Sequence, residues 1–405
     1  MIMKMPGWLE TSSTFVRYGI LALGVVAVVV IVSQAIFIIE TWLPYPVNDH
    51  LVFIIEYSHV TEIGGLLRYL FSPHNEHIMP IPKLIMVLDY ELFNGSMVLL
   101  LLVNVVSCVF LTILLIRFAP TDRPRGRALF SLLTACLFSF SWGLECFFWS
   151  FPFQQLLVLP ISILALHQGI VALTRGSFAA YLLAIVLSLA ATMTSAQGLL
   201  VLPILAITPF LARRNLRMIL AFGLPGAAVW TLYFLILPAG GSGAFHSLTR
   251  PWEIIRFLSY YFGVPLTAHP KMVGVGQAVG VAVFVGALVV FVWALRSRVP
   301  QSPNGLFWVS SFLFGGGIAL VIALGRLYSV ATLAPSSRYW PFVALVLVSS
   351  CALLLMTAVD SVRDTDFVFQ VGMLILLPLF LFVHLRVGEN WIEWTDNHKE
   401  AAVSY

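Results

Sequence analysis

Long apolar runs recur along nearly the whole chain, separated by short polar segments. A helix needs about 20 mostly apolar residues to cross a bilayer, and this window predicts about eleven spans. The sequence therefore predicts an all-α polytopic membrane protein, in which residues 1–405 form a single integral membrane domain. The predicted spans cover residues 15–40, 96–118, 128–143, 153–173, 177–193, 198–212, 216–237, 273–295, 304–324, 339–359 and 367–386.

One polar segment, Pro46–Gly95, interrupts this pattern between the first two predicted spans. Apolar spacing within it predicts short amphipathic helices along the membrane at 51–57, 62–71 and 82–93, with Pro73 ending the second. The stretch His74-Asn75-Glu76-His77 is then expected in a turn between such helices. The ionisable residues of the segment are Asp49, His50, Glu56, His59, Glu62, Arg68, His74, Glu76, His77, Lys83, Asp89 and Glu91.

The composition, 60% hydrophobic and 10% charged, excludes an ordinary soluble domain. The first apolar run is too long for the core of a secretory signal, so we interpret it as a retained first span. The four cysteines suggest no disulfide framework, since all but Cys146 fall within predicted spans. Charge concentrated in one loop of so apolar a chain makes that loop the first place to look for chemistry.

The sidedness of positive charge predicts the orientation. More than half of the 22 Lys and Arg residues lie in short segments on one side of the predicted spans, which is the cytoplasmic side by the positive-inside rule. The N-terminus is then inside, and the first loop and the tail after Arg386 are outside. The residues on the inner side are Lys4, Arg17, Arg117, Arg123, Arg125, Arg127, Arg175, Arg213, Arg214, Arg217, Arg296, Arg298 and Arg363.

Four more segments are predicted on the outer side. Residues 143–152 form a tight aromatic loop, and residues 194–198 a short connection. Residues 238–272 form a second larger loop, in which 252–262 have the spacing of an interfacial helix. Residues 325–339 carry two arginines near span ends.

Asp49 follows the first span closely and is a candidate general base toward a hydroxyl or amine acceptor. The same spacing also fits a helix N-cap. The His74-Asn75-Glu76-His77 stretch offers a base, hydrogen bonds to a substrate, or metal ligands, against the alternative of a structural turn. Its spacing differs from the helical zinc-protease motif, which needs two histidines four residues apart.

Arg326 and Arg338 are candidates for phosphate binding, because guanidinium groups grip phosphate with two parallel hydrogen bonds. The alternative is that they extend to lipid headgroups. Glu145 is the only acidic residue of its loop and is a candidate for assisting Asp49 or for binding the acceptor, against an exposed loop carboxylate. Gln154, at the start of the next span, is a candidate for substrate binding.

These features resemble the GT-C superfamily, the polytopic glycosyltransferases that use polyprenyl-phosphate-linked sugars. The likeness rests on a cytoplasmic N-terminus, a first span, and a large external loop that opens with Asn48-Asp49 and contains membrane-parallel helices. His74-Asn75-Glu76-His77 with Ile-Met-Pro, Trp149-x-Phe-x-Phe-Gln-Gln and Ser-Ser-Arg338-Tyr339 look like patterns of its uncharacterised bacterial members. Asn48-Asp49 replaces paired acids, so no metal ligand is assigned, and the need for a divalent cation stays open.

The resemblance implies an inverting glycosyltransferase of the bacterial cytoplasmic membrane, with its active site on the outer face. Its partners would be a polyprenyl-phosphate-linked sugar donor, a cell-envelope glycan or lipid acceptor, and membrane lipids, without nucleic acid or a certain cofactor. Asp49 would be catalytic, Arg326 and Arg338 would bind the lipid phosphate, and His74, Asn75, Glu76, His77, Glu145 and Gln154 would bind substrate. The alternatives are a lipid-linked glycan polymerase or ligase, and a lipid or glycan transporter.

Overall fold

We describe the computed structural model of the chain, which is built from α-helices and short 3-10 helices (η). In the part of the chain that it describes, no β-strand occurs. That part comprises residues 7–43, 49–74, 77–139, 145–148, 153–212, 216–236, 249–263, 273–326, 337–358, 381–390, 392–393 and 396. The helices are α1 (Gly7–Thr41), α2 (Asp49–Ser58), α3 (Ile63–Phe71), α4 (Pro80–Phe93), α5 (Val98–Arg117), α6 (Pro124–Phe138), α7 (Glu145–Phe148), α8 (Phe153–Arg175), α9 (Phe178–Thr194), η2 (Ala196–Leu200), α10 (Val201–Leu211), α11 (Leu216–Ile236), α13 (Pro251–Gly263), α14 (Val273–Arg296), η5 (Val299–Gln301), α15 (Pro303–Arg326), η7 (Ser337–Tyr339) and α17 (Trp340–Ala358), and residues 381–390 are also helical.

Seven of these helices are long and apolar enough to cross a membrane, and the protein is therefore an all-α membrane protein. Three shorter apolar helices lie at 126–138, 178–194 and 196–211, where the sequence predicted further spans. The last predicted span, 367–386, falls mostly outside the described residues, although its end is helical. The seven candidate spans are Gly24–Thr41, Val98–Arg117, Phe153–Arg175, Arg217–Ile236, Gly274–Arg296, Pro303–Gly325 and Trp340–Thr357.

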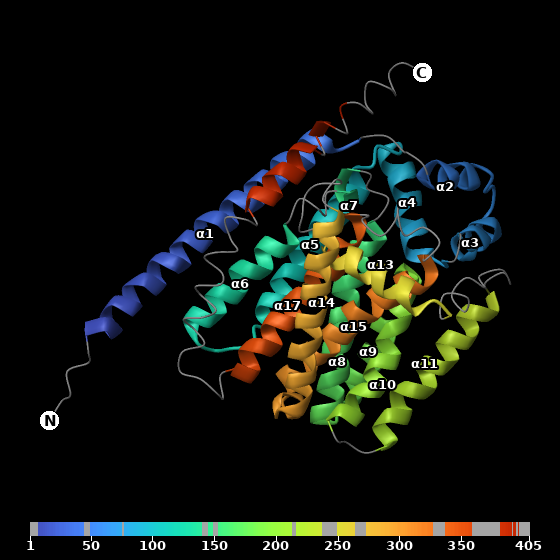
Figure 1. Cartoon of the computed structure of the whole chain (residues 1–405). Helices are drawn as coiled ribbons and strands as arrows, with labels where there is room; N and C mark the ends of the chain where they lie inside the picture. Colours follow the sequence, from blue (N-terminus) through green and yellow to red (C-terminus); the bar gives the residue numbers. More distant parts are fainter. Residues whose placement is uncertain are drawn as a thin grey trace.

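Successive helices run up and down the bundle, so their connections gather at two opposite ends (Figure 1). At one end lie α2, α3, α4 and α7. The links from α5 to α6, from α8 to α9 and from α14 to α15 lie at the other end. The arginines of those links and of the adjoining helix ends, Arg117, Arg123, Arg127, Arg175, Arg217, Arg296 and Arg298, are therefore far from α2–α4.

Side chains of α8, α10, α13, α15 and α17 form the central core. They make one continuous apolar cluster with residues of α5, α6, α9, α11 and α14. Two buried tryptophans tie the core to the neighbouring helices through their indole N–H groups. Trp308 donates to the carbonyl of Phe118 at 3.0 Å, and Trp340 donates to that of Leu137 at 2.7 Å. A buried indole N–H needs such a partner, because hydrocarbon offers none.

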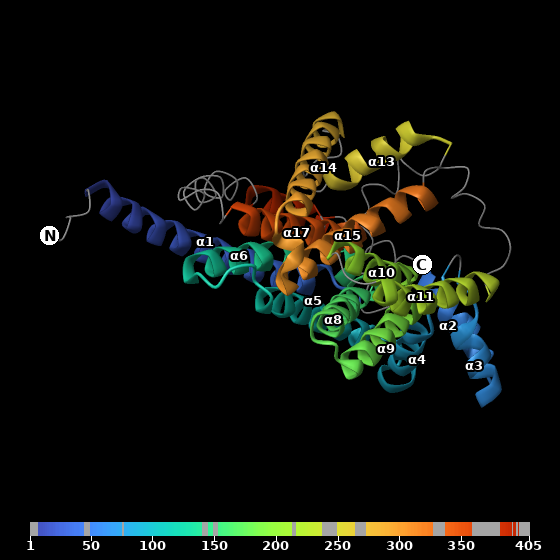
Figure 2. The same ribbon diagram turned by 90° about the horizontal axis from the view of Figure 1, so that it is seen from below.

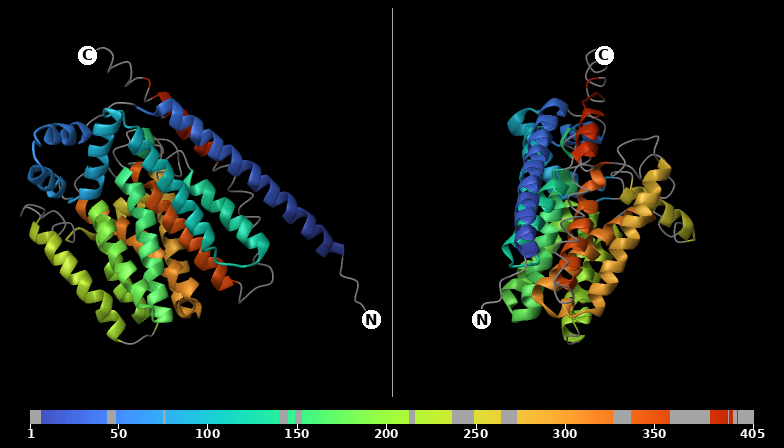
Figure 3. Two further views of the ribbon diagram at one scale, coloured as in Figure 1. Left: turned by 180° about the vertical axis from the view of Figure 1, so that it is seen from behind. Right: turned by 60° about the vertical axis from the view of Figure 1, so that its left-hand side comes forward.

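α1 lies along one side of the bundle, next to residues 381–390 (Figures 1 and 3). The hydroxyl of Ser33 on α1 and the Nε2 atom of His384 are 2.7 Å apart and share a hydrogen bond. The ring of Phe37 lies 5.7 Å from the His384 ring, and the absence of a side chain at Gly388 makes room for Phe37. The first and the last helix that the structure describes therefore contact each other directly.

α2, α3 and α4 form a small unit that projects from one end of the bundle (Figures 1 and 2). They correspond to the three short helices predicted in the first loop. α4 starts with two prolines in its first turn and ends at Asn94 and Gly95, whose φ angles of 54° and 67° are left-handed. The unit packs on the bundle through an apolar cluster that includes Phe53, Met86 and Phe153. This cluster fixes the first loop against the start of α8.

Candidate functional site

His74 and His77 face each other in the turn between α3 and α4. Each backbone N–H donates to the other residue's carbonyl, at 2.8 Å from His74 and at 3.0 Å from His77, which forms an isolated antiparallel bridge. The His74 ring lies 4.2 Å from the ring of Phe53 on α2. The predicted turn is thus confirmed. Asn75 and Glu76, which lie between them in the sequence, are outside the described residues.

The residues after the turn connect it to three other parts of the bundle. The backbone N–H of Ile78 donates to the hydroxyl of Tyr233 on α11 at 3.1 Å. The Ile78 side chain packs with Tyr233 and with Leu199 of η2. Met79 joins the cluster that contains Phe153 of α8. The turn is therefore held beside the start of α8, η2 and the end of α11.

Glutamine side chains from α8 and η2 gather near this junction. Gln154 and Gln155 are each 7% exposed, and Gln197 is 6% exposed. The Gln197 amide donates to Oε1 of Gln155 at 3.1 Å, and the Ser195 hydroxyl bonds to Oε1 of Gln197. Oε1 of Gln154 has no hydrogen-bond partner in the part of the chain that is described. Gln154 was predicted to bind substrate, whereas the link from Gln155 to Gln197 was not expected from the sequence.

The short helix α7 is joined to η7, although about 190 residues separate them in sequence. The Cys146 thiol lies 3.6 Å from the carbonyl oxygen of Arg338, to which it donates. Asn104 of α5 donates its side-chain amide to the carbonyl of Cys146. The Arg338 guanidinium lies over the Tyr339 ring, 5.3 Å from its centre. Residues 145–148 thus form a helical turn where the sequence predicted a loop.

Three predicted site residues are described only by their backbone. Asp49 is the first residue of α2, Glu145 the first of α7, and Arg326 the last of α15. Their side chains lie outside the part of the chain that is described, so phosphate binding by Arg326 and Arg338 stays a prediction. These three residues, the His74–His77 turn, Gln154 at the start of α8 and Arg338 of η7 belong to elements at the same end of the bundle (Figure 1).

Some ionisable residues of the first loop are buried and have structural partners. The Asp89 carboxylate, 1% exposed, accepts from the N–H groups of Met97 at 3.0 Å and Leu99 at 2.8 Å, which caps the start of α5. Burial lowers the pKa of His50 to about 4, so its ring is neutral at pH 7. Lys83 is fully buried as well. Some of the ionisable residues that drew attention to this loop therefore stabilise its packing.

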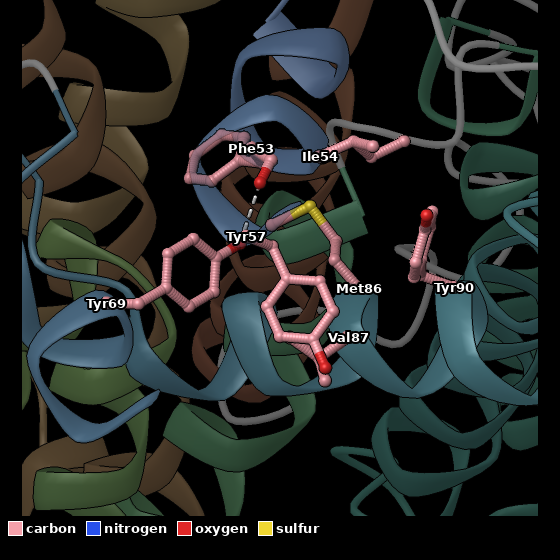
Figure 4. Close-up of a pocket in the computed structure, with 7 residues that line it drawn as sticks. All are labelled: Phe53, Ile54, Tyr57, Tyr69, Met86, Val87 and Tyr90. Atoms are coloured by element: carbon pink, nitrogen blue, oxygen red, sulfur yellow. Dashed lines mark hydrogen bonds between the residues drawn. The ribbon is translucent and has the colours of Figure 1, made fainter. Parts of the chain in front are cut away.

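A recess opens among the aromatic side chains of α2, α3 and α4 (Figure 4). The rings of Tyr57 and Tyr69 lie 5.6 Å apart, and the Tyr69 hydroxyl donates to the Phe53 carbonyl at 3.2 Å. The volume of the recess is about 10 Å³, which is room for about one water molecule. It is too small for a sugar ring. The recess is lined by Phe53, Ile54, Tyr57, Tyr69, Met86, Val87 and Tyr90.

No cluster of three or more His, Cys, Asp or Glu side chains that could hold a metal occurs among the described residues. His74 and His77 would need a third ligand from elsewhere to bind zinc, which prefers four-coordinate sites. The need for a divalent cation therefore stays open.

Comparison with known proteins adds no relative. No protein-family model and no curated protein matches the chain. The assignment of a function therefore rests on the residues and on their arrangement.

Proposed function

We propose that the protein is an inverting glycosyltransferase that transfers a sugar from a polyprenyl-phosphate donor to a cell-envelope glycan or lipid at the outer face of the cytoplasmic membrane. One observation carries this proposal. The elements with the candidate base, the His74–His77 turn, Glu145, Gln154 and the two arginines all belong to one end of the helix bundle. The arginine-bearing links lie at the opposite end, as expected if that end is cytoplasmic.

In this proposal Asp49 takes the proton from the acceptor hydroxyl, and the acceptor oxygen attacks the anomeric carbon. The bond from that carbon to the phosphate oxygen breaks, and the polyprenyl phosphate leaves from the opposite face, which inverts the anomeric centre. Arg326 and Arg338 stabilise the negative charge that grows on the departing phosphate. His74, Asn75, Glu76, His77, Glu145 and Gln154 bind the sugar and the acceptor.

The placement of charge within the spans favours this proposal over a transporter. Transporters that couple to ions keep ionisable residues near the middle of the bilayer. In the seven candidate spans, the Asp, Glu, Lys and Arg residues stand only at or near the ends. These residues are Glu40, Arg117, Arg175, Arg217 and Arg296. His167 lies inside α8, where its ring stacks on that of Phe118 at 4.4 Å. The concentration of charge outside the spans suits chemistry at the membrane surface.

Asp49→Asn tests the proposal, since it keeps the shape of the side chain and removes the base. The purified protein in lipid nanodiscs is given a radiolabelled polyprenyl-phosphate hexose and a lipid acceptor. We expect turnover to fall by about 100-fold or more while donor binding is kept. Glu62→Gln is the matched control, because Glu62 is an exposed carboxylate just before α3, and its turnover should be unchanged.

Near-normal turnover of Asp49→Asn would show that Asp49 is not the base and has only a structural role at the start of α2. Failure of the unaltered protein to transfer sugar from glucosyl, galactosyl, mannosyl and arabinosyl donors would reject the proposed reaction.

A further inference from the structure

Lys83, on α4, is the residue of the first loop whose burial calls for an explanation. It is fully buried, and its ammonium group makes three hydrogen bonds. These go to the Tyr69 carbonyl at 2.8 Å, the Ser72 carbonyl at 2.9 Å and the Ser72 hydroxyl at 2.6 Å. An ammonium has three N–H donors, so all of them are used by neutral acceptors.

The position of these acceptors explains why a cation is tolerated there. Tyr69 lies in the last turn of α3, and Ser72 is the C-cap of that helix. The carbonyls at a helix C-terminus carry partial negative charge, which stabilises a nearby cation. The ammonium also lies 4.8 Å from the centre of the Tyr69 ring and 5.4 Å from that of Phe53. Burial lowers the pKa of Lys83, and the charge of Glu56 opposes that shift.

Two of these contacts lead to the His74–His77 turn by separate routes. Along the chain, Ser72 precedes His74 by two residues, so its bonds to Lys83 fix the entry to the turn. Through space, the Phe53 ring that contacts the ammonium also contacts the His74 ring at 4.2 Å. The backbone bridge between His74 and His77 then carries this constraint to the second histidine.

We propose that Lys83 is a positioning residue that sets the conformation of the His74–His77 turn. Its role in catalysis rests on the proposed function, whereas its effect on the turn does not. The competing possibility is that Lys83 only joins α3 to α4, in which case its loss would loosen the whole α2–α4 unit and not the turn in particular.

The test compares Lys83→Met with Arg68→Met, which removes an exposed cation from the same unit. Hydrogen exchange is measured over residues 72–79, whose bridged amides are His74 and His77, and over α2, α3 and α4. We expect Lys83→Met to speed exchange in 72–79 by at least 10-fold and exchange in the three helices by less than 3-fold. Arg68→Met should leave both unchanged.

Sugar transfer gives the second readout. Lys83→Met should lower kcat/KM for the polyprenyl-phosphate hexose by at least 10-fold with a fall in kcat, since a displaced turn no longer orients the sugar and the acceptor for reaction. Ser72→Ala, which keeps Lys83 and removes one acceptor, should shift both readouts in the same direction by a smaller factor. This variant also covers the case in which Lys83→Met does not fold.

Two outcomes would overturn the inference: unchanged exchange in 72–79, or equal acceleration throughout α2–α4. Selective acceleration in 72–79 with normal kcat would support the positioning of the turn and overturn its role in catalysis. If the unaltered protein transfers no sugar, the proposed function fails by itself. The exchange data then decide on their own whether Lys83 positions the turn.

Discussion

Asp89 and His50 illustrate how single residues of the first loop stabilise the fold. Asp89 uses both carboxylate oxygens to cap α5, and removing such a cap costs about 1–2 kcal/mol. His50 is buried in α2 as a neutral ring, so its protonation in the folded protein requires a charge in a poorly solvated place. Acid should therefore weaken this part of the molecule through His50.

The pKa of about 4 for His50 predicts acid lability. The folded value is below the unfolded value of about 6.5, so the unfolded chain binds the proton more tightly between these two pH values. Above pH 6.5 the residue has no effect, and stability is lost as the pH falls from 6.5 to 4, by roughly 3 kcal/mol in total. We expect His50→Asn to lose less thermal stability than the unaltered protein between pH 7 and pH 4.5. The control is His59→Asn, at an exposed histidine nearby, and equal losses in both variants would contradict the prediction.

The turn at His74–His77 could be predicted from the sequence, because Pro73 ends the preceding helix and a run of polar residues follows. The burial of Lys83 and Asp89 was missed, since charged residues between two spans suggest an exposed loop. A periodic signal was present: Lys83 stands three and four residues before Met86 and Val87, on the buried stripe of α4. The joining of α7 to η7 had no local signal, because it depends on packing between distant segments.

At the scale of elements, the glycines of α13 and α14 permit the closest approach of two helices among the glycines that the structure describes. A Cβ atom on Gly280 would lie 1.8 Å from the carbonyl oxygen of Ser259, and one on Gly263 would lie 1.7 Å from that of Gly276. The two backbones are therefore in direct contact, as small residues allow between membrane helices. The sequence predicted 252–262 as an interfacial helix. In the structure Phe257, Tyr261 and Phe262 of this helix are buried in the core.

Gly280→Ala should separate α13 from α14 and lower the thermal denaturation temperature of the detergent-solubilised protein by several degrees, because overpacking costs about 1–3 kcal/mol. Gly286→Ala is a control on the same helix, where an added Cβ meets no atom within 4 Å. That variant should be neutral or more stable, since alanine is the better helix former by up to about 1 kcal/mol. Equal denaturation temperatures for the two variants would show that the crossing tolerates a methyl group.

For the whole molecule, the separation of the two ends predicts their sides of the membrane. The first loop and the basic links lie at opposite ends of the bundle, and basic links favour the cytoplasm. We expect Glu62→Cys to react with a membrane-impermeant maleimide in intact cells. Asp122→Cys, in the link from α5 to α6, should react only after permeabilisation; both positions are exposed. The native cysteines, which are buried or half-buried, set the background. If Asp122→Cys were labelled in intact cells and Glu62→Cys only after permeabilisation, the orientation would be the opposite one, and an outward active site would be rejected.

The contact of Ser33 and Phe37 with His384 and Gly388 has a consequence for how the protein is made. Ser33 leaves the ribosome 351 residues before His384. This part of the α1 surface therefore finds its partner only after the intervening helices have been synthesised. Until then, the Ser33 hydroxyl and the Phe37 ring lack their contacts with His384. α1 also contacts α6 and α7, so only the completion of its packing is a late event in biogenesis. A ribosome stalled before residue 381 would hold an α1 that lacks the contact with His384.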